Sequence, residues 1–337
     1  MRILAALFVG ALMLAAGGAG AVGFQSGTVP DPADKPLAIG IWYPSNGPVP
    51  SQPNTPFRQA LSLDGAISGT RLPLVVISHG AGGWLGGHAD MALALAEAGY
   101  VVVAVTHSGD NRDDETYPAS RWMVDRPRHV ARVLDYMLAG WSGHGRIDAS
   151  RIGIFGFSAG AYTALVAIGG TPNLKTATAH CADNPAELVC QLGMTNDFTT
   201  PAVATRAASA WVHDRRIKAA VIAAVGFGFA FDAKGLAPVT IPVQLWAGSD
   251  DRRVPYASNT EIVRQSLPMP PDFHMVEGAG HFAFLPPCNP ELETALPEVW
   301  AMVCVDAPGF DRLAFHRVFN KEIIDFFNKH LPSTTQP

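Results

Sequence analysis

Charge is scarce in this sequence, and basic residues are not in excess. Only 16% of the 337 residues are charged, and 24 Lys and Arg stand against 29 Asp and Glu, for a net charge of −5. Binding to DNA or RNA needs a basic surface that neutralises phosphates, so no nucleic-acid partner is expected. Because 48% of the residues are hydrophobic, the chain can bury a core, which excludes disorder as its main state.

Regular repeats are also lacking. The sequence contains no Gly-X-Y period, no heptad run, no low-complexity block and no repeat at solenoid periods. Collagen-like, coiled-coil and solenoid architectures are therefore not expected. At ~100–200 residues per domain, the length allows one large domain or two small ones.

Long apolar runs are absent except at the start of the chain. Arg2 precedes an apolar run over residues 3–16, and the small residues Ala19-Gly20-Ala21 follow it. This order is typical of a secretory signal peptide, so we expect residues 1–21 to be removed and the protein to be secreted or periplasmic. The alternative, an uncleaved membrane anchor, is disfavoured because the run is shorter than the ~20 residues that span a bilayer. No Cys follows the cleavage site, so no lipoprotein anchor, and no stable membrane anchor after cleavage, is expected.

Cysteines are few but even in number. The four are Cys181, Cys190, Cys288 and Cys304, and an even count in an exported chain predicts disulfides. Three pairings are possible. Pairing neighbours in the sequence closes the shortest loops, which favours 181–190 and 288–304. The alternative of a metal site is disfavoured, because the spacing around His180 and the adjacent cysteine fits no zinc pattern.

Apolar runs of strand length alternate with segments of helical spacing along the rest of the chain. The expected strands cover residues 37–43, 72–78, 101–106, 152–157, 219–225, 243–246 and 274–276. The expected helices cover residues 88–98, 126–138, 159–168 and 261–267, and a closing helix lies within 310–330. Continuous apolar strands suit a sheet that is covered on both faces. The sequence therefore predicts an α/β fold with a mostly parallel sheet, in one domain over residues 22–337.

One segment interrupts this alternation. Residues 171–214 contain two of the cysteines and lack a clear strand. Long irregular inserts in compact domains are often lids or binding loops. We therefore expect residues 171–214 to form a disulfide-containing cap over the functional site.

The sequence Gly156-Phe157-Ser158-Ala159-Gly160 fits the pattern G-x-S-x-G and stands between an expected strand and an expected helix. A sharp strand-to-helix turn strains its central residue and needs small neighbours two positions away on each side. The two glycines meet that need, so Ser158 is predicted to project into a cleft as a nucleophile. The alternative, an idle serine in a glycine-bracketed turn, is disfavoured by this context.

A serine nucleophile needs a base and an acid that orients the base, in the order Ser, Asp or Glu, His on this type of sheet. Asp250 and Asp251 follow one expected strand, and His281 follows the next. Both positions lie at carboxyl ends of strands, where ligands bind in open α/β sheets. One of the adjacent carboxylates should face the histidine while the other caps the turn, and Asp251 is favoured as the acid.

A second glycine-rich turn lies in the segment VVISHGAGG, where the expected strand ends and HGAGG follows it. Acyl transfer needs preorganised N–H donors for the oxyanion. The backbone N–H groups of Ala81 and Ala159 are the natural pair. His79 is expected to fix this loop by hydrogen bonds rather than to act as a base.

Other chemistry-bearing residues give weaker signals. Four acidic residues follow the strand VVVAVT and are expected to be a solvated loop with helix caps rather than a metal site; they are Asp110, Asp113, Asp114 and Glu115. Four aromatic residues are candidates for a substrate pocket, with core packing as the alternative; they are Trp84, Phe227, Phe229 and Phe282. No metal and no cofactor is predicted.

These motifs together resemble the α/β-hydrolase superfamily, and more narrowly the bacterial dienelactone-hydrolase-like proteins related to platelet-activating-factor acetylhydrolase. The segments that carry the resemblance are IWYPS, VVISHGAGG, DRPRHVARVLD, RIGIFGFSAGAYTAL, AGSDDRRVP and GAGHFAFLPPC. The resemblance implies an α/β-hydrolase fold, with Ser158, His281 and Asp251 as the triad and Ala81 as the first oxyanion donor. True dienelactone hydrolases use a Cys nucleophile, so the serine favours an esterase or acetylhydrolase.

The sequence thus predicts an exported serine hydrolase that cleaves small-molecule or lipid-like carboxylic esters through an acyl-enzyme. The same triad also suits a polyester, a lipid acetyl ester, an amide or acyl transfer to an alcohol, and the residues do not separate these. A non-catalytic binding protein on a hydrolase scaffold is disfavoured by the complete Ser, Asp and His set.

Overall fold

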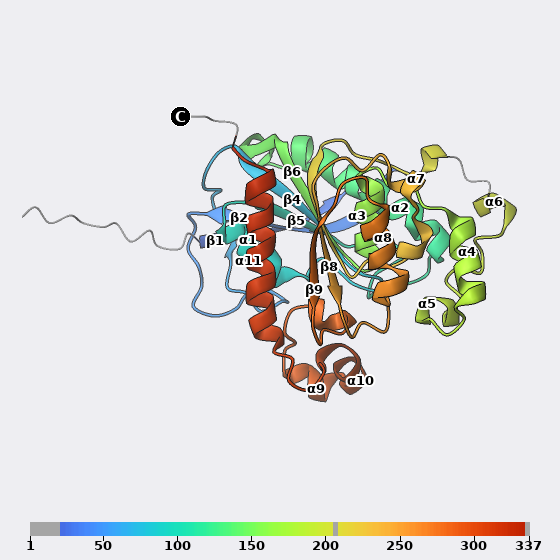
Figure 1. Ribbon diagram of the computed structural model, residues 1–337. Coiled ribbons are helices and arrows are strands. Elements are labelled where there is room, and N and C mark those ends of the chain that lie inside the picture. Colours follow the sequence, from blue (N-terminus) through green and yellow to red (C-terminus); the bar gives the residue numbers. More distant parts are fainter. Residues whose placement is uncertain (1–20, 205–207, 334–337) are drawn as a thin grey trace, which may run out of the picture.

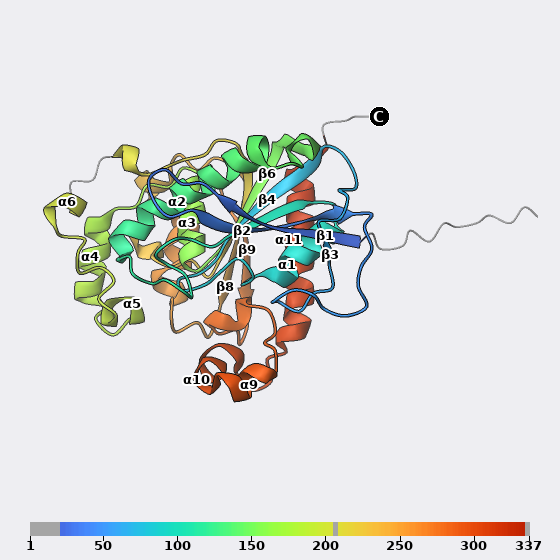
Figure 2. The same ribbon diagram turned by 180° about the vertical axis from the view of Figure 1, so that it is seen from behind.

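A twisted sheet of nine strands organises the protein (Figures 1 and 2). The computed structural model describes residues 21–204 and 208–333. The strands are β1 (Ala21–Val29), β2 (Leu37–Ser45), β3 (Ser62–Leu63), β4 (Leu72–Ser78), β5 (Val101–Val105), β6 (Ile147–Phe157), β7 (Ile217–Ala223), β8 (Val243–Gly248) and β9 (Asp272–Val276). Their order is β3-β1-β2-β5-β4-β6-β7-β8-β9, and β2 runs antiparallel to both β1 and β5. From β5 to β9 all pairings are parallel.

Helices cover both faces of this sheet. They are α1 (Ala89–Glu97) and α11 (Arg312–His330) on one face, and α2 (Ala119–Asp135), α3 (Ala159–Ala167) and α8 (Thr260–Ser266) on the other (Figure 1). Successive side chains of a strand point to opposite faces. In β4, Leu74 and Val76 accordingly enter the core under α2 and α3, while Val75 and Ile77 enter the core under α1 and α11. The continuous apolar strands thus fill two cores, and the predicted α/β fold is confirmed.

Most expected elements lie within a few residues of their predicted bounds, but β6 begins at Ile147 rather than at residue 152, and several short elements, β3 among them, were not expected. The strand β1 was not expected, because its polar residues obscure the strand pattern at the edge of the sheet. The helix α2 begins at Ala119 rather than at residue 126, and Pro127 lies inside it. The predicted start at residue 126 is wrong, because the buried Trp122 and Met123 extend the packed face of the helix toward the N-terminus.

The insert at residues 171–214 contains helix where an irregular segment was expected. Its helices are α4 (Leu174–Asp183), α5 (Leu188–Gln191) and α6 (Pro201–Ala204), and they project beside α2 and α8 (Figure 1). Asn173 caps α4, since its side-chain oxygen accepts from the N–H groups of Lys175 and Thr176. Whether the insert works as a cap depends on its contacts at the site, described below.

Both predicted disulfides are confirmed. Cys181 is bonded to Cys190 and joins α4 to α5 inside the insert. Cys288 is bonded to Cys304 and closes a loop that holds α9 (Glu291–Ala295) and α10 (Pro297–Val299), at the carboxyl end of the parallel strands (Figure 1).

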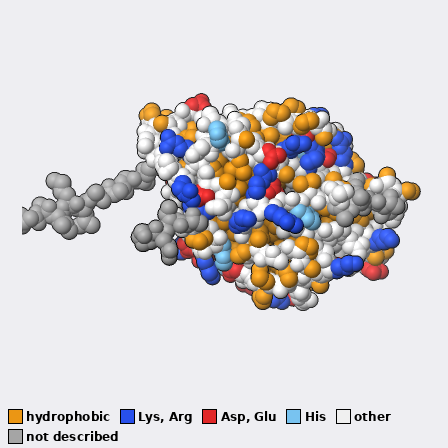
Figure 3. Space-filling view, turned by 90° about the horizontal axis from the view of Figure 1, so that it is seen from above, with side chains coloured by type: hydrophobic (Ala, Val, Ile, Leu, Met, Phe, Trp, Pro, Cys, Tyr) orange, Lys and Arg blue, Asp and Glu red, His pale blue; other side chains and the backbone are white. Residues whose placement is uncertain are grey.

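The predicted signal peptide lies outside the described residues, except for Ala21, with which β1 begins. None of the described helices is long and apolar enough to cross a membrane. Seen from above, on the side opposite α9 and α10, basic and acidic side chains lie among hydrophobic ones (Figure 3).

Removing the disulfide Cys288–Cys304 should lower both stability and turnover. The double variant Cys288→Ser/Cys304→Ser removes a cross-link between residues that are 16 positions apart in the sequence. For a loop of this length, the expected loss in unfolding free energy is about 3 kcal/mol. The ester hydrolysis rate should also fall, because this loop follows the turn that carries His281. Urea denaturation and ester turnover measure the two effects. The variant Cys181→Ser/Cys190→Ser is the control and should spare turnover of a small acetate ester; equal rate losses in both variants would contradict this assignment.

Candidate active site

Ser158 occupies a strained turn between β6 and α3. Its φ is 55° and its ψ is −117°, a region that residues with a side chain rarely adopt. The turn is held at both backbone ends. The N–H of Ser158 donates to Ala223 O at 3.0 Å, and its carbonyl oxygen accepts from Ala161 N at 3.0 Å and from Gly226 N at 3.1 Å. These hydrogen bonds fix the backbone from which the Ser158 side chain extends, at the carboxyl ends of the parallel strands.

Close packing explains the two glycines that flank the serine. A Cβ on Gly160 would lie 1.9 Å from the carbonyl oxygen of Ser78, and a Cβ on Gly156 would lie 2.2 Å from the carbonyl oxygen of Gly160. Both contacts are with backbone atoms, which cannot move aside cheaply. The G-x-S-x-G pattern is thus required by the approach of α3 to the ends of β4 and β6.

The structure brings Ser158, His281 and Asp251 into one chain of hydrogen bonds. The distance from His281 Nε2 to Ser158 Oγ is 3.0 Å, and that from His281 Nδ1 to Asp251 Oδ2 is 2.7 Å. A carboxylate only accepts, so Nδ1–H is the donor to Asp251. With a neutral imidazole, Nε2 then carries the lone pair and accepts from the serine hydroxyl.

Asp251 is itself anchored, whereas Asp250 points elsewhere. The second oxygen of Asp251 accepts from the N–H groups of Arg253 and Val254, both at 2.9 Å. Asp250 is exposed, and its side chain accepts from Ser249 Oγ at 3.3 Å. The geometry therefore selects Asp251 of the two adjacent carboxylates.

The predicted oxyanion donors flank the serine. Ala159 is the first residue of α3, and Ala81 lies in the turn after β4. A Cβ on Gly80, next to Ala81, would lie 3.3 Å from Ser158 Cβ, so this turn passes beside the serine. Across the described residues, neither Ala81 N–H nor Ala159 N–H has a hydrogen-bond acceptor. Two unengaged donors next to Ser158 suit an oxyanion hole.

His79 fixes the turn after β4 and is not placed to act as a base. Its Nδ1 lies 2.6 Å from Gly80 O and must donate, and its Nε2 accepts from His107 N at 3.1 Å. Burial lowers the pKa of His79 well below the ordinary value of 6.5. Both ring nitrogens of a neutral histidine are thus in use.

The four candidate pocket aromatics have different surroundings. Trp84 and Phe282 are partly exposed, and the ring of Phe282 lies 5.3 Å from that of His281. Phe227 and Phe229 are buried, with 5% and 2% exposure. The ring of Phe229 stacks on His180 at 4.1 Å, so these two phenylalanines form a floor under the insert.

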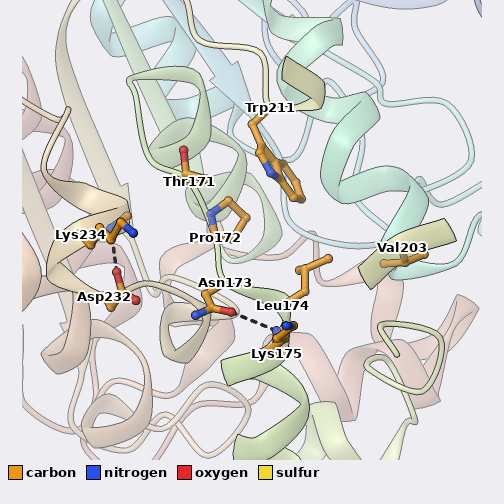
Figure 4. Close-up of a pocket in the computed structure, with 10 residues that line it drawn as sticks. Thr171, Pro172, Asn173, Leu174, Lys175, Val203, Trp211, Asp232 and Lys234 are labelled. Carbon is orange, nitrogen blue, oxygen red and sulfur yellow. Dashed lines mark hydrogen bonds between the residues drawn. The ribbon is translucent and has the colours of Figure 1, made fainter. Parts of the chain in front are cut away.

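Two pockets lie near these elements. A pocket of about 320 Å³ adjoins the site and includes Arg253, His281 and Phe282 among its walls. A larger pocket, of about 420 Å³, lies at the base of the insert, with Trp211, Asn173 and Lys234 around it (Figure 4). No residue of the Ser158–His281–Asp251 chain borders the larger pocket.

The acidic loop differs from the expectation at one residue. Asp110 was expected to be solvated, but it is buried and paired with the fully buried Arg126, whose Nη1 lies 2.7 Å from Asp110 Oδ2. Asp114 pairs with Lys35 at 2.8 Å, and both Asp113 and Glu115 are exposed. The partner of Asp110 lies on α2, which the loop sequence alone does not reveal.

Buried polar residues on α2 were missed from the sequence. Arg126 and His129 are fully buried, although both belong to residue types that usually face solvent. A signal was present, because Arg126 shares one helical stripe with the buried Val130, Val133 and Met137. A charge on an apolar stripe requires a buried partner, and that partner is Asp110.

Comparison with known proteins agrees with this architecture. Residues 63–209 match the model of the dienelactone hydrolase family. Over these residues the chain is similar to the dienelactone hydrolase family. The match confirms the resemblance seen in the sequence and supports a carboxylic ester hydrolase. Ser158 and Ala81 lie inside the matched range, whereas Asp251 and His281 lie beyond it.

A solved structure extends the agreement in fold to nearly the whole chain. A ferulic acid esterase from Streptomyces cinnamoneus superposes with a TM-score of 0.64 and 19% sequence identity, covering 95% of this chain and 93% of that one. At this identity the likeness concerns the fold. Among curated proteins, no relative matches the sequence.

Four buried histidines should make stability depend on pH. Burial lowers the pKa of His88 and His129 from 6.5 to about 4, and it also lowers the pKa of His79 and His107 well below 6.5. Unfolding exposes these rings to water. Below about pH 6.5 the unfolded state then binds protons that the folded state does not bind. The contribution of these rings to the unfolding free energy should therefore be constant above that pH and fall as the pH drops from 6.5 toward 4, by about 2 kcal/mol at pH 5 for each of His88 and His129.

Urea denaturation at pH 7 and pH 5 measures this dependence. His88 is the informative position, because neither of its ring nitrogens has a partner within the described part of the chain. The variant His88→Leu should reduce the proton uptake on unfolding by about one. Equal stability of the native protein at the two pH values would show that these histidines are already charged when folded.

Proposed function

We propose that this protein is an exported serine esterase in which Ser158 is the nucleophile, His281 the general base and acid, and Asp251 the orienting acid. The observation that carries the proposal is the Ser158–His281–Asp251 hydrogen-bond chain beside two unengaged backbone N–H groups. The ester hydrolase family supplies the reaction class.

The geometry supports a two-step reaction. Ser158 Oγ attacks the ester carbonyl while its proton moves to His281 Nε2. The N–H groups of Ala81 and Ala159 stabilise the oxyanion of the tetrahedral intermediate. Its collapse breaks the bond to the alcohol, which leaves with the proton from His281. Water, deprotonated by the same imidazole, then attacks the acyl-enzyme; the bond to Ser158 Oγ breaks, His281 returns the proton to that oxygen, and the carboxylic acid is released. No cofactor takes part.

The substrate class is a small-molecule or lipid-like ester of a carboxylic acid. Phe282 is a partly exposed aromatic residue whose ring lies 5.3 Å from that of His281, and Trp84 is partly exposed in the segment after β4. Both suit an apolar or aromatic acyl group. A fold shared with a ferulic acid esterase supports an ester substrate. The alternatives remain a polyester, a lipid acetyl ester, an amide or acyl transfer, and turnover of p-nitrophenyl esters, an anilide and an ester with added methanol separates them.

Two further features belong to the proposal. The insert at residues 171–214 acts as a cap, which is supported by its packing on Phe227 and Phe229 next to the serine turn. Export from the cytoplasm is supported by the two disulfides, which persist in oxidising compartments. A mature chain that retains residues 1–21 would contradict the export proposal.

Loss of the nucleophile or the base should abolish turnover in a non-additive way. Ser158→Ala and His281→Ala should each lower kcat by several orders of magnitude, and the double variant should lose little more, because the two residues act as a unit. A fluorophosphonate probe should label the native protein and the control Ser142→Ala, whose serine is exposed and remote in sequence, but not Ser158→Ala. A double variant that loses the product of both single effects would contradict the assignment.

The two adjacent carboxylates should differ sharply. Asp251→Asn removes the charge that stabilises the imidazolium and disturbs the tautomer of His281, so kcat should fall by up to ~10⁴. Asp250→Asn changes an exposed side chain that does not contact the histidine and should lie within about threefold of the native rate. Steady-state hydrolysis of one ester compares them. Equal losses, or the reverse order, would refute the choice of Asp251 as the acid.

A further inference from the structure

A buried ion pair lies under the turn that carries the first oxyanion donor. The side chain of Arg126 is 0% exposed and that of Asp110 is 6% exposed, with Nη1 and Oδ2 2.7 Å apart. Replacing a buried ion pair by apolar residues of similar volume often leaves stability unchanged or improved. Stability alone therefore does not account for this pair, and its other contacts are informative.

Those contacts hold the backbone on both sides of Ala81. Arg126 Nη2 donates to His79 O, and Asp110 Oδ1 accepts from Gly82 N at 3.1 Å. The residues between these anchors are Gly80 and Ala81 alone. One ion pair thus fixes the carbonyl that precedes this dipeptide and the amide that follows it.

The peptide group between the anchors is the one that matters chemically. The carbonyl of Gly80 and the N–H of Ala81 belong to the same planar trans peptide, so they point in opposite directions. His79 Nδ1–H holds that carbonyl at 2.6 Å. With the carbonyl held and both flanking groups anchored, the direction of the Ala81 N–H is determined.

The support for this turn continues into the core through a chain of neutral histidines. A guanidinium only donates, so Arg128 Nη2, 3.3 Å from His129 Nε2, makes that nitrogen an acceptor. His129 Nδ1–H then donates to His107 Nδ1 at 3.2 Å, and His107 Nε2–H donates to Ser78 Oγ at 2.9 Å. The N–H of His107 in turn holds the ring of His79.

We propose that Arg126 and Asp110 are positioning residues for ester hydrolysis, which act through the backbone of residues 79–82 to aim the N–H of Ala81 at the developing oxyanion. The proposal rests on the proposed function. Oxyanion stabilisation depends on donors that are oriented before the reaction, and glycine at residue 80 would otherwise leave this peptide free to rotate. The pair does not contact the substrate, so it should affect the transition state and not the binding of the ester.

The decisive variant replaces the pair without leaving a lone charge. Arg126→Met/Asp110→Leu should fold with a melting temperature near that of the native protein. Its kcat should fall about 10- to 100-fold, with KM changed less than twofold, since loss of one oxyanion donor costs ~10²–10³. Binding of a trifluoromethyl ketone, whose serine adduct carries an oxyanion, should weaken by the same factor as kcat/KM.

The pair Arg216–Asp214 provides a matched control. It is a partly buried ion pair at the start of β7, with Nη2 and Oδ2 in contact, at the opposite edge of the sheet from Ser158. Arg216→Met/Asp214→Leu should leave kcat and the ketone affinity unchanged. If both double variants lose activity in proportion to their melting temperatures, the role of Arg126 is merely structural and the proposal is overturned.

Two measurements distinguish failure of the positioning role of Arg126 from failure of the proposed esterase function. Fluorophosphonate labelling of Ser158 in the native protein tests the function itself, whereas unchanged kcat in a labelled Arg126→Met/Asp110→Leu variant overturns only the positioning role. If that variant does not fold, Arg126→Lys serves instead. A lysine keeps the charge but lacks the planar fork that reaches Asp110 and His79 O together, so kcat should again fall at constant KM, and native turnover in it would refute the proposal.

Discussion

The site depends on how closely α3 approaches the ends of β4 and β6. At Gly160 the separation leaves no room for a Cβ, which would meet the carbonyl oxygen of Ser78 at 1.9 Å. This contact forces the chain to turn sharply after β6, and the turn places Ser158 at a φ of 55°. It also sets the first N–H of α3 beside the turn after β4. One packing constraint therefore positions the proposed nucleophile and both proposed oxyanion donors.

The remaining groups of the site come from loops, and buried polar contacts hold those loops in place. Asp251 is fixed by two backbone N–H groups, and His281 is fixed by Asp251. The turn that carries His281 has a further support, because His316 Nε2 donates to Ala283 O at 2.9 Å while its Nδ1 contacts Asp90 at 2.7 Å. Two of the buried charged residues, Arg126 and Asp110, lie behind the turn that carries Ala81. Such contacts add little stability, but they restrict each loop to one arrangement.

The sequence predicted those parts of the structure that are determined locally. The strand-to-helix turn at Ser158 follows from glycine spacing and flanking patterns, and the alternation of strands and helices follows from apolar runs. The start of α2 was missed, because tertiary packing of Trp122 and Met123 extends the helix seven residues further back. The burial of Asp110 was missed because its partner lies on another element. A contact between two elements can be predicted only when the fold is known, although the charge of Arg126 on an apolar stripe indicated that a buried partner exists.

Neighbouring contacts connect the insert to the nucleophile. The carbonyl of Ser158 accepts from Gly226 N, and the next residue, Phe227, adopts a left-handed conformation with φ 56°. The ring of Phe227 packs against Phe198 of the insert at 6.3 Å and against Trp122 of α2 at 5.7 Å. The floor under the proposed cap is thus the same backbone turn that holds the serine in its strained conformation. Because strain of this kind persists only where the surroundings over-determine it, the packing of the insert on Phe227 also supports the strained conformation of Ser158, the proposed nucleophile.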